Sequence, residues 1–232
     1  MSINFNEEIN EIINPWKDAT NQIEILKLDK EIYEDVELKK SWAWHNQPDD
    51  LKEKYKLKNQ FPLPINGNFR KAKYLLLYSN PASETCEIHE DTTKDKLLKC
   101  FKLEEDAEFV IANADWSRFY TKELNRFFRF QEKYTIDKVR DFLNEFCFIN
   151  YCAYSTGVNS FNFSDRQIID KISKLPSTEF VKKLVNTWIK YKGIDNIYIV
   201  RAREYVWRNH IFEKLDLSLL EEEKCEKDKN NY

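Results

Sequence analysis

The sequence KAKYLLLYSNPASE, residues 71–84, joins a short apolar run to a polar turn that contains a proline. Residues 74–77 are apolar or aromatic and predict a buried strand, which the polar residues after them would end. Pro81 has a fixed backbone angle, so the turn would hold Asn80 in a single direction. Asparagine is also ordinary turn chemistry after a strand, so this residue alone does not establish a site.

Two further apolar runs follow along the chain, FCFINYCAY at 146–154 and NIYIVRA at 196–202. Amphipathic helical patterns separate them, one at 135–146 and a longer one at 177–193, which Gly193 would end. Alternation of short buried strands with helices is typical of the α/β class. We therefore expect a three-layer sandwich with a mostly parallel central sheet and helices on both faces.

The chain of 232 residues has no internal repeat and no linker rich in Gly, Ser or Pro, which favours a single domain over 1–232. Residues 1–60 read as a charged, helical N-terminal extension, with helical patterns at 4–13, 30–40 and 48–55. Residues 216–232 are highly charged and predict a frayed tail.

Composition excludes several classes of function. The five cysteines form no CxxC pair and only three histidines are present, so we expect reduced thiols, no metal site and no cofactor. The acidic N-terminus lacks the basic and apolar regions of a secretory signal, and no apolar run is long enough to span a membrane, so we expect a cytoplasmic protein. The net charge of −3 means that any nucleic acid would have to bind a local basic patch.

Polar residues follow each of the three apolar runs: Asn80 after the first, Asn150 at the end of the second and Arg201 after the third. In open α/β sheets, ligands bind outside the carboxyl ends of the strands. We therefore expect the two carboxamides and the guanidinium to converge on one small polar group. The alternative is that both asparagines serve only as turn residues.

These runs resemble the uracil-DNA glycosylase superfamily over residues 61–207, through AKYLLLYSNPAS, FCFINYCAY and IYIVRA in that order. The mismatch-specific branch of that family carries an Asn-Pro dipeptide in its water-positioning loop, which Asn80 and Pro81 match. A later strand of the family ends in an asparagine that binds the flipped base, and Asn150 matches it. The family's late His-Pro-Ser or Asn-Pro-Ser loop has no counterpart after residue 202.

The resemblance implies hydrolysis of an N-glycosidic bond in DNA repair or modified-base processing. Asn80 would orient the attacking water, Asn150 would read the base edge, and Arg201 would stabilise the departing base. Base-flipping enzymes also stack an aromatic ring on the base. The aromatic residues near the two strand ends are Tyr78, Tyr151 and Tyr154.

Two basic clusters are candidates for contact with a DNA backbone. Arg118, Lys122 and Arg126 recur at i, i+4 spacing with aromatic residues between them, and would share one face of a helix. Arg203 and Arg208 follow the third run. In each case the structural alternative is a solvated basic face over packed aromatic side chains.

The sequence thus predicts a divergent DNA-glycosylase-like hydrolase that recognises a normal, modified or mismatched nucleobase. The alternative is a non-catalytic binding protein on the same fold, which recognises a nucleotide, DNA or a protein partner. The matched pair Asn80 and Asn150 favours the first, and the missing late histidine motif favours the second.

Overall fold

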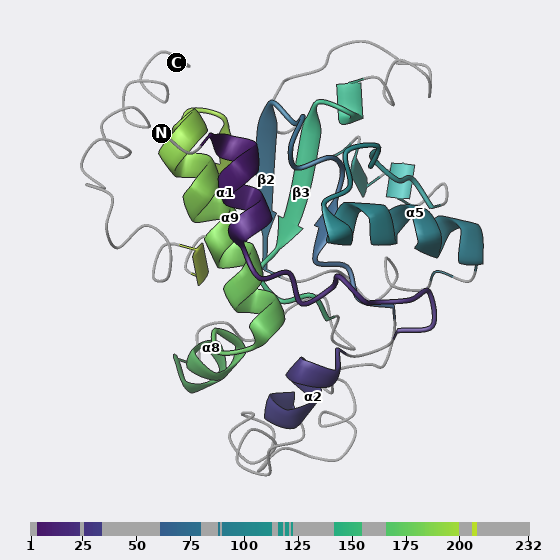
Figure 1. The fold of residues 1–232 in the computed structure, drawn as a ribbon, viewed down its shortest axis with the longest axis vertical. Helices are drawn as coiled ribbons and strands as arrows, with labels where there is room; N and C mark the ends of the chain where they lie inside the picture. Colours follow the sequence, from purple (N-terminus) through teal and green to yellow (C-terminus); the bar gives the residue numbers. More distant parts are fainter. Residues whose placement is uncertain are drawn as a thin grey trace.

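The computed structural model describes residues 4–23, 26–33, 61–79, 88, 90–112, 116–117, 119–120, 122, 142–154, 166–199 and 206–207. The helices and strands in these ranges form one α/β arrangement (Figure 1). In chain order they are α1 (Phe5–Glu11), α2 (Lys27–Tyr33), β1 (Ile65–Asn66), β2 (Tyr74–Tyr78), α5 (Asp91–Lys102), β3 (Phe146–Asn150), α8 (Arg166–Ile172), α9 (Pro176–Lys192) and β4 (Ile197–Ile199).

The four strands form a single sheet in the order β1-β3-β2-β4. The central strand β2 runs parallel to both β3 and β4, whereas the edge strand β1 runs antiparallel to β3. The predicted α/β class and its three strands are confirmed, and the sheet is mixed. β1 was not predicted, because its two residues lie in a segment rich in proline and turn residues that gives no strand periodicity.

The two faces of the sheet differ in composition because successive side chains of a strand point to opposite sides. One face, here called the helix face, carries small and branched apolar side chains: Ile65, Leu75, Leu77, Cys147 and Ile149. The other face, here called the aromatic face, carries rings from three strands: Tyr74, Tyr78, Phe146, Phe148 and Tyr198. Part of the chain's high aromatic content is therefore gathered on one face of the sheet, inside the core.

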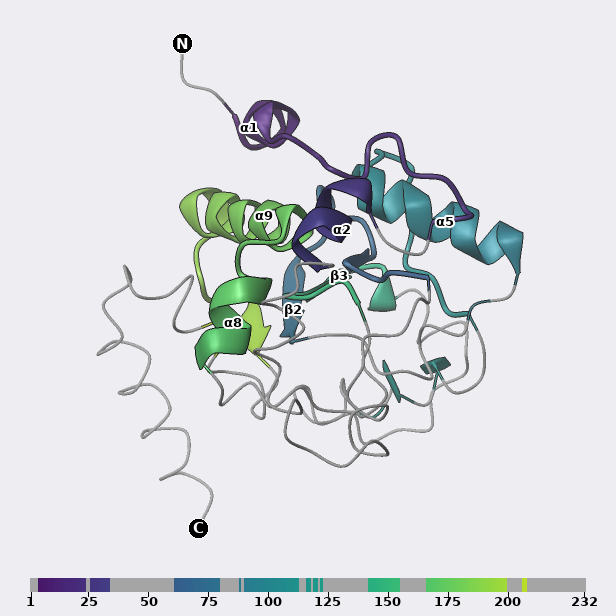
Figure 2. The same ribbon diagram turned by 90° about the horizontal axis from the view of Figure 1, so that it is seen from below.

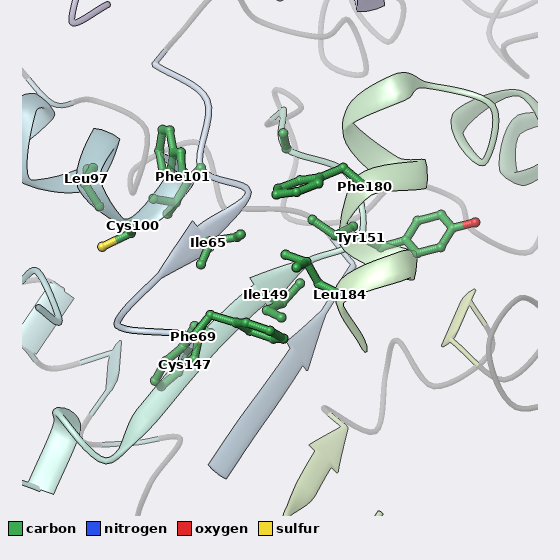
Figure 3. Packing of buried hydrophobic residues seen from close by; sticks show 14 of the residues in the cluster. Ile65, Phe69, Leu97, Cys100, Phe101, Cys147, Ile149, Tyr151, Phe180 and Leu184 are labelled. Atoms are coloured by element: carbon green, nitrogen blue, oxygen red, sulfur yellow. The ribbon is translucent and has the colours of Figure 1, made fainter. Parts of the chain in front are cut away.

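Both long helices, α5 and α9, cover the helix face (Figure 2). Phe101 of α5 and Leu184 of α9 are fully buried against it (Figure 3). α9 begins with proline in its first turn and ends at Gly193, so the helix predicted at 177–193 is confirmed to within one residue. Burial of one such large apolar side chain stabilises the fold by about 1.5–3 kcal/mol.

The aromatic face is covered, in the described residues, by a second layer of rings. Phe148 contacts the rings of Tyr120 and Phe109, with centroids 4.6 and 5.1 Å apart, in edge-on geometry. Phe142 lies 4.8 Å from Phe146. Edge-to-face and tilted pairs of this kind add about 0.5–1.5 kcal/mol each beyond the area that they bury.

Residues 4–23 and 26–33, here called the N-terminal strap, pack across the helices rather than extending away from them. α1 begins at a capping box formed by Asn4 and Glu7, and Phe5 then packs against Trp188 of α9 at 6.2 Å. Further along, Trp16 is fully buried against Phe101 of α5 at 5.4 Å. The described part of the predicted helical extension therefore belongs to the main hydrophobic core (Figure 2).

Some predicted boundaries shift. The pattern predicted as a helix at 135–146 gives way to strand β3 at Phe146, with helical structure at 142–143 and a turn between. Of the helix predicted at 30–40, residues 30–33 belong to α2, which begins at Lys27, and residues 34–40 lie outside the described residues. The pattern at 48–55 and the tail at 216–232 lie outside the described residues. Among the residues described, no helix has the length and apolar character needed to cross a membrane.

Candidate functional site at the carboxyl edge of the sheet

The three parallel strands β3, β2 and β4 are neighbours, so their carboxyl ends lie along one edge of the sheet, as the sequence predicted. Of the predicted site residues, the structure describes Tyr78, Lys122, Asn150, Tyr151 and Tyr154. The others lie outside the described residues: Asn80, Arg118, Arg126, Arg201, Arg203 and Arg208.

Tyr78 and Asn150 are brought together at this edge. They are direct partners in the parallel pairing of β2 with β3, so their side chains point to the same face. Tyr78 is half-buried, and its ring stacks on Phe148 at 5.6 Å with an interplanar angle of 19°. The pair thus combines an aromatic ring with a neighbouring carboxamide.

The orientation of the Asn150 carboxamide is set by the protein. Its Nδ2 donates a 2.7 Å hydrogen bond to the carbonyl of Leu63, and its backbone N–H donates to the carbonyl of Pro64. The residue is only 7% exposed. An asparagine amide has a second N–H and an acceptor oxygen, so this one bond fixes its direction without using the acceptor.

Tyr151, which follows β3 directly, is completely buried. Its ring packs edge-on against Trp207 at 5.3 Å, and Trp207 Nε1 donates a 2.9 Å hydrogen bond to the carbonyl of Tyr78. Burial raises the pKa of the Tyr151 hydroxyl, which points away from the neighbouring apolar side chains (Figure 3). In this arrangement neither ring face is accessible, so Tyr151 serves packing rather than stacking on a base.

Tyr154 is also buried, and its hydroxyl belongs to a polar network inside the protein. The hydroxyl donates a 2.6 Å hydrogen bond to Oδ2 of Asp29 and accepts one of 3.2 Å from the backbone N–H of Leu26. Asp29 Oδ1 accepts a third bond, of 3.0 Å, from the backbone N–H of Ser177. Tyr154 is therefore held by the N-terminal strap, which is itself bonded to α9 through Asp29, and does not stack on a ligand in this arrangement.

Asp29 acts as a cap for α9 from a distant part of the chain. Ser177 is the second residue of that helix, where backbone N–H groups lack partners within the helix and the helix dipole attracts negative charge. Burial raises the pKa of the Asp29 carboxyl, and the hydrogen bonds from Ser177 and Tyr154 oppose that rise. Nothing in the sequence singled out Asp29, because a lone aspartate in a charged helical pattern reads as a solvated residue.

The described part of the edge offers hydrogen bonds and a ring face rather than ionised groups. The side chains of Tyr78 and Asn150 are a phenol and a carboxamide. The Asp29 carboxylate is fully enclosed and bonded to protein donors, which assigns it to capping rather than to acid–base chemistry. In the residues described, no three His, Cys, Asp or Glu side chains are placed to hold a metal ion. Such an edge suits an uncharged, planar, polar ligand.

The predicted basic stripe is described only in part. Lys122 is exposed, whereas Trp116 and Tyr120 are buried and Phe119 packs 5.8 Å from Tyr78. At these positions the aromatic side chains cover the sheet, as the structural alternative expects. Phe119 is tilted by 46° to the Tyr78 ring and packs against it in addition to Phe148.

The described cysteines are buried free thiols, as predicted for core residues: Cys100, Cys147 and Cys152. Burial raises the pKa of Cys100 to about 12. Cys100 also donates through its Sγ to the carbonyl of Glu108 at 3.3 Å. A thiol in this setting is not an activated nucleophile.

Comparison of the chain with protein-family models, with curated proteins and with solved structures found no match. The resemblance to the uracil-DNA glycosylase superfamily therefore stays a prediction that rests on the sequence motifs alone.

Proposed function

We propose that the protein binds a nucleobase at the carboxyl edge of β3, β2 and β4 and hydrolyses its N-glycosidic bond, as a divergent DNA-glycosylase-like enzyme. The observation that carries this proposal is the pairing of Tyr78 with Asn150 across two neighbouring parallel strands, at the edge where α/β sheets bind ligands. Within the same proposal, the fold is a three-layer sandwich with helices on both faces, and the protein acts on DNA in the cytoplasm.

Tyr78 is the stacking residue in this proposal, because Tyr151 and Tyr154 are enclosed. Its ring is braced by Phe148 and Phe119, so little side-chain entropy is lost when a base stacks on it. Asn150, whose amide is oriented by Leu63, supplies hydrogen bonds to the base edge. Stacking on an aromatic ring is worth about 1–3 kcal/mol per base.

The proposed reaction needs a positioned water and stabilisation of the leaving base. The water oxygen forms a bond to the anomeric carbon, the carbon–nitrogen bond breaks, and its electron pair leaves with the base, which receives the proton from the water. Asn80 would orient the water, and Arg201 would stabilise the charge that develops on the base. Lys122 and the arginines at 118, 126, 203 and 208 would contact the DNA backbone.

A second candidate is a binding protein without catalytic activity. The specific observation in its favour is the chemistry of the described edge, where Tyr78, Ser79 and Asn150 supply no ionised group. A site of this kind recognises a base or nucleotide without a general acid or base.

An abasic-site assay separates the two candidates. Oligonucleotides that carry uracil, hypoxanthine, mismatched thymine or a bulky modified cytosine are incubated with the protein, and binding to each is followed by fluorescence anisotropy. Cleavage of one oligonucleotide that is lost in Asn80→Ala supports the enzyme. Binding without cleavage supports the binding protein, and the absence of both for every oligonucleotide contradicts nucleobase recognition.

The matched control for the site lies on the same strand. Tyr74 and Tyr78 are both half-buried on the aromatic face, and Tyr74 stacks on Phe146 as Tyr78 stacks on Phe148. Tyr74 lies at the amino end of β2, away from the proposed site. Tyr78→Leu is therefore expected to weaken binding of the oligonucleotide about tenfold or more, whereas Tyr74→Leu leaves the affinity unchanged.

A further inference from the structure

We propose that the N-terminal strap holds the turn at residues 151–154 in place through Asp29, so that docking of the strap and the order of the carboxyl edge are coupled. In this proposal the order of the candidate site depends on whether the strap is docked.

The proposal begins from the three elements that meet at Asp29. This carboxylate lies on α2 of the strap, and it binds Tyr154 from the turn after β3 and Ser177 from the first turn of α9. Figure 1 places α2, the beginning of α9 and the arrowhead of β3 at the same end of the molecule. The network therefore lies at the carboxyl edge.

Backbone hydrogen bonds also join this turn to the end of β2, the central strand. The backbone N–H of Tyr151 donates to the carbonyl of Tyr78 at 2.9 Å, and that of Cys152 donates to Ser79 at 2.8 Å. Asp29 is thus linked to the residues that precede Asn80 by its hydrogen bond to Tyr154, by the backbone of the turn, and by the hydrogen bonds of Tyr151 and Cys152 to β2. Removing the carboxylate would leave Tyr154 and Ser177 without this buried acceptor, and a buried polar group is costly to leave unpaired.

The anchors of α1 within the strap lie at the opposite end of α9. Glu8 of α1 pairs with Lys190 and accepts a 2.7 Å hydrogen bond from the hydroxyl of Tyr191. Lys192 lies over the ring of Phe5, 4.5 Å from its centroid. These contacts fix α1 without touching the turn, so they provide a matched control for the effect of Asp29.

Amide hydrogen exchange of the full chain, followed by NMR without any ligand, tests the coupling. Asp29→Ala is expected to raise the exchange rates of the Tyr151 and Cys152 amides about tenfold or more, because local opening becomes easier. Tyr154→Phe, which keeps the ring and removes only the hydroxyl, is expected to give the same rise. Glu8→Ala is expected to raise exchange in α1 and to leave these two amides unchanged.

A double variant that combines Asp29→Ala with Tyr154→Phe distinguishes coupling from two independent structural losses. If Asp29 acts through Tyr154, the combined variant exchanges no faster at Tyr151 than the stronger single variant. A multiplied effect, or unchanged exchange at Tyr151 and Cys152 in Tyr154→Phe, would overturn the proposal. That single variant decides the outcome if Asp29→Ala does not fold.

The relevance of this coupling to ligand binding rests on the proposed function, but the exchange experiment does not. A failure to bind any oligonucleotide would contradict nucleobase recognition and leave the exchange result standing. Conversely, unchanged exchange in the variants would contradict the coupling even if the protein cleaves DNA.

Discussion

The hydroxyl of Tyr154 lies 2.6 Å from Oδ2 of Asp29, and this bond joins residues that are 125 positions apart in the chain. It connects a helix of the N-terminal strap to the turn that follows β3. Because Asp29 also caps α9, one buried side chain ties together three elements that meet at the carboxyl edge of the sheet.

Removal of the Tyr154 hydroxyl is the simplest test of this network. Tyr154→Phe is expected to lower the free energy of unfolding by about 1–3 kcal/mol, because a buried carboxylate and the backbone N–H of Leu26 each lose a hydrogen bond. Urea unfolding followed by circular dichroism measures the change. The control is Tyr74→Phe, at a half-buried residue, where a smaller loss is expected; equal losses would contradict the importance of the network.

The same network predicts a pH dependence of stability. Burial raises the pKa of Asp29, so the folded state binds its proton more tightly than the unfolded state does. The stabilisation from this group is complete below about pH 3.8, its ordinary pKa, and is lost as the pH rises through the raised pKa of the folded state. Relative to Asp29→Asn, the native protein should therefore lose stability as the pH rises. Denaturation of both proteins between about pH 3 and pH 8 measures this difference, and a constant difference would contradict it.

Gly67, which follows β1, and Gly193, which follows α9, provide a matched test of close packing. At Gly67, φ is +109° and an added Cβ would lie 2.4 Å from the carbonyl oxygen of Phe146. At Gly193, φ is +74° but no atom lies within 4 Å of such a Cβ. Gly193→Ala is expected to cost about 1–3 kcal/mol for its backbone conformation alone, because φ of +74° with ψ of −175° is a region that almost only glycine adopts. Gly67→Ala should cost clearly more, and thermal unfolding showing equal costs would contradict the steric argument.

Substitution of the buried Asn66 is expected to lower the free energy of unfolding strongly. Its Nδ2 donates to the carbonyl of Val110 and to the hydroxyl of Tyr120, and its Oδ1 accepts from the backbone N–H of Val110. Asn66→Leu is expected to lower the free energy of unfolding by about 2–4 kcal/mol, since several buried groups lose their partner. Chemical denaturation measures it. Asn10→Leu, at an exposed residue of α1, is the comparison and should cost less.

The buried thiols are expected to resist alkylation. The pKa of Cys100, raised to about 12 by burial, leaves almost no thiolate at neutral pH, and burial raises that of Cys147 as well. Iodoacetamide should therefore modify neither residue in the folded protein, whereas both react after unfolding in denaturant. Mass spectrometry of the digested protein gives the extent of modification, and rapid modification of Cys100 in the native state would refute the predicted burial.

The sequence predicted those elements whose pattern is strong and local. The apolar runs around Leu76 and Phe148 and the capped, amphipathic pattern of α9 each determine an element without help from distant residues. The strand β1 escaped prediction because two residues cannot show a period. Its place in the sheet depends on pairing with β3, about 80 residues later in the chain.

The residues of the candidate site also fall into two groups, those that local patterns predict and those whose place depends on tertiary contacts. The sequence predicted that Asn80, Asn150 and Arg201 would converge at the carboxyl edge, and in the described part of that edge the structure pairs Asn150 with Tyr78. That Tyr154 would be enclosed could not be predicted, because its partner Asp29 lies in a different region of the chain. Burial of a polar residue depends on tertiary contacts, to which local periodicity is insensitive.

The long separation between the strap and its partners has a consequence for the nascent chain. Ser177 leaves the ribosome 148 residues after Asp29, which at roughly 5–20 residues per second corresponds to a delay of roughly seven to thirty seconds. During that interval Asp29 lacks its donor in α9, and for most of it also the hydroxyl of Tyr154, which is made 125 residues after Asp29. The strap therefore cannot complete its contacts at Asp29 until α9 is made, and newly made protein is most vulnerable to aggregation and proteolysis until then.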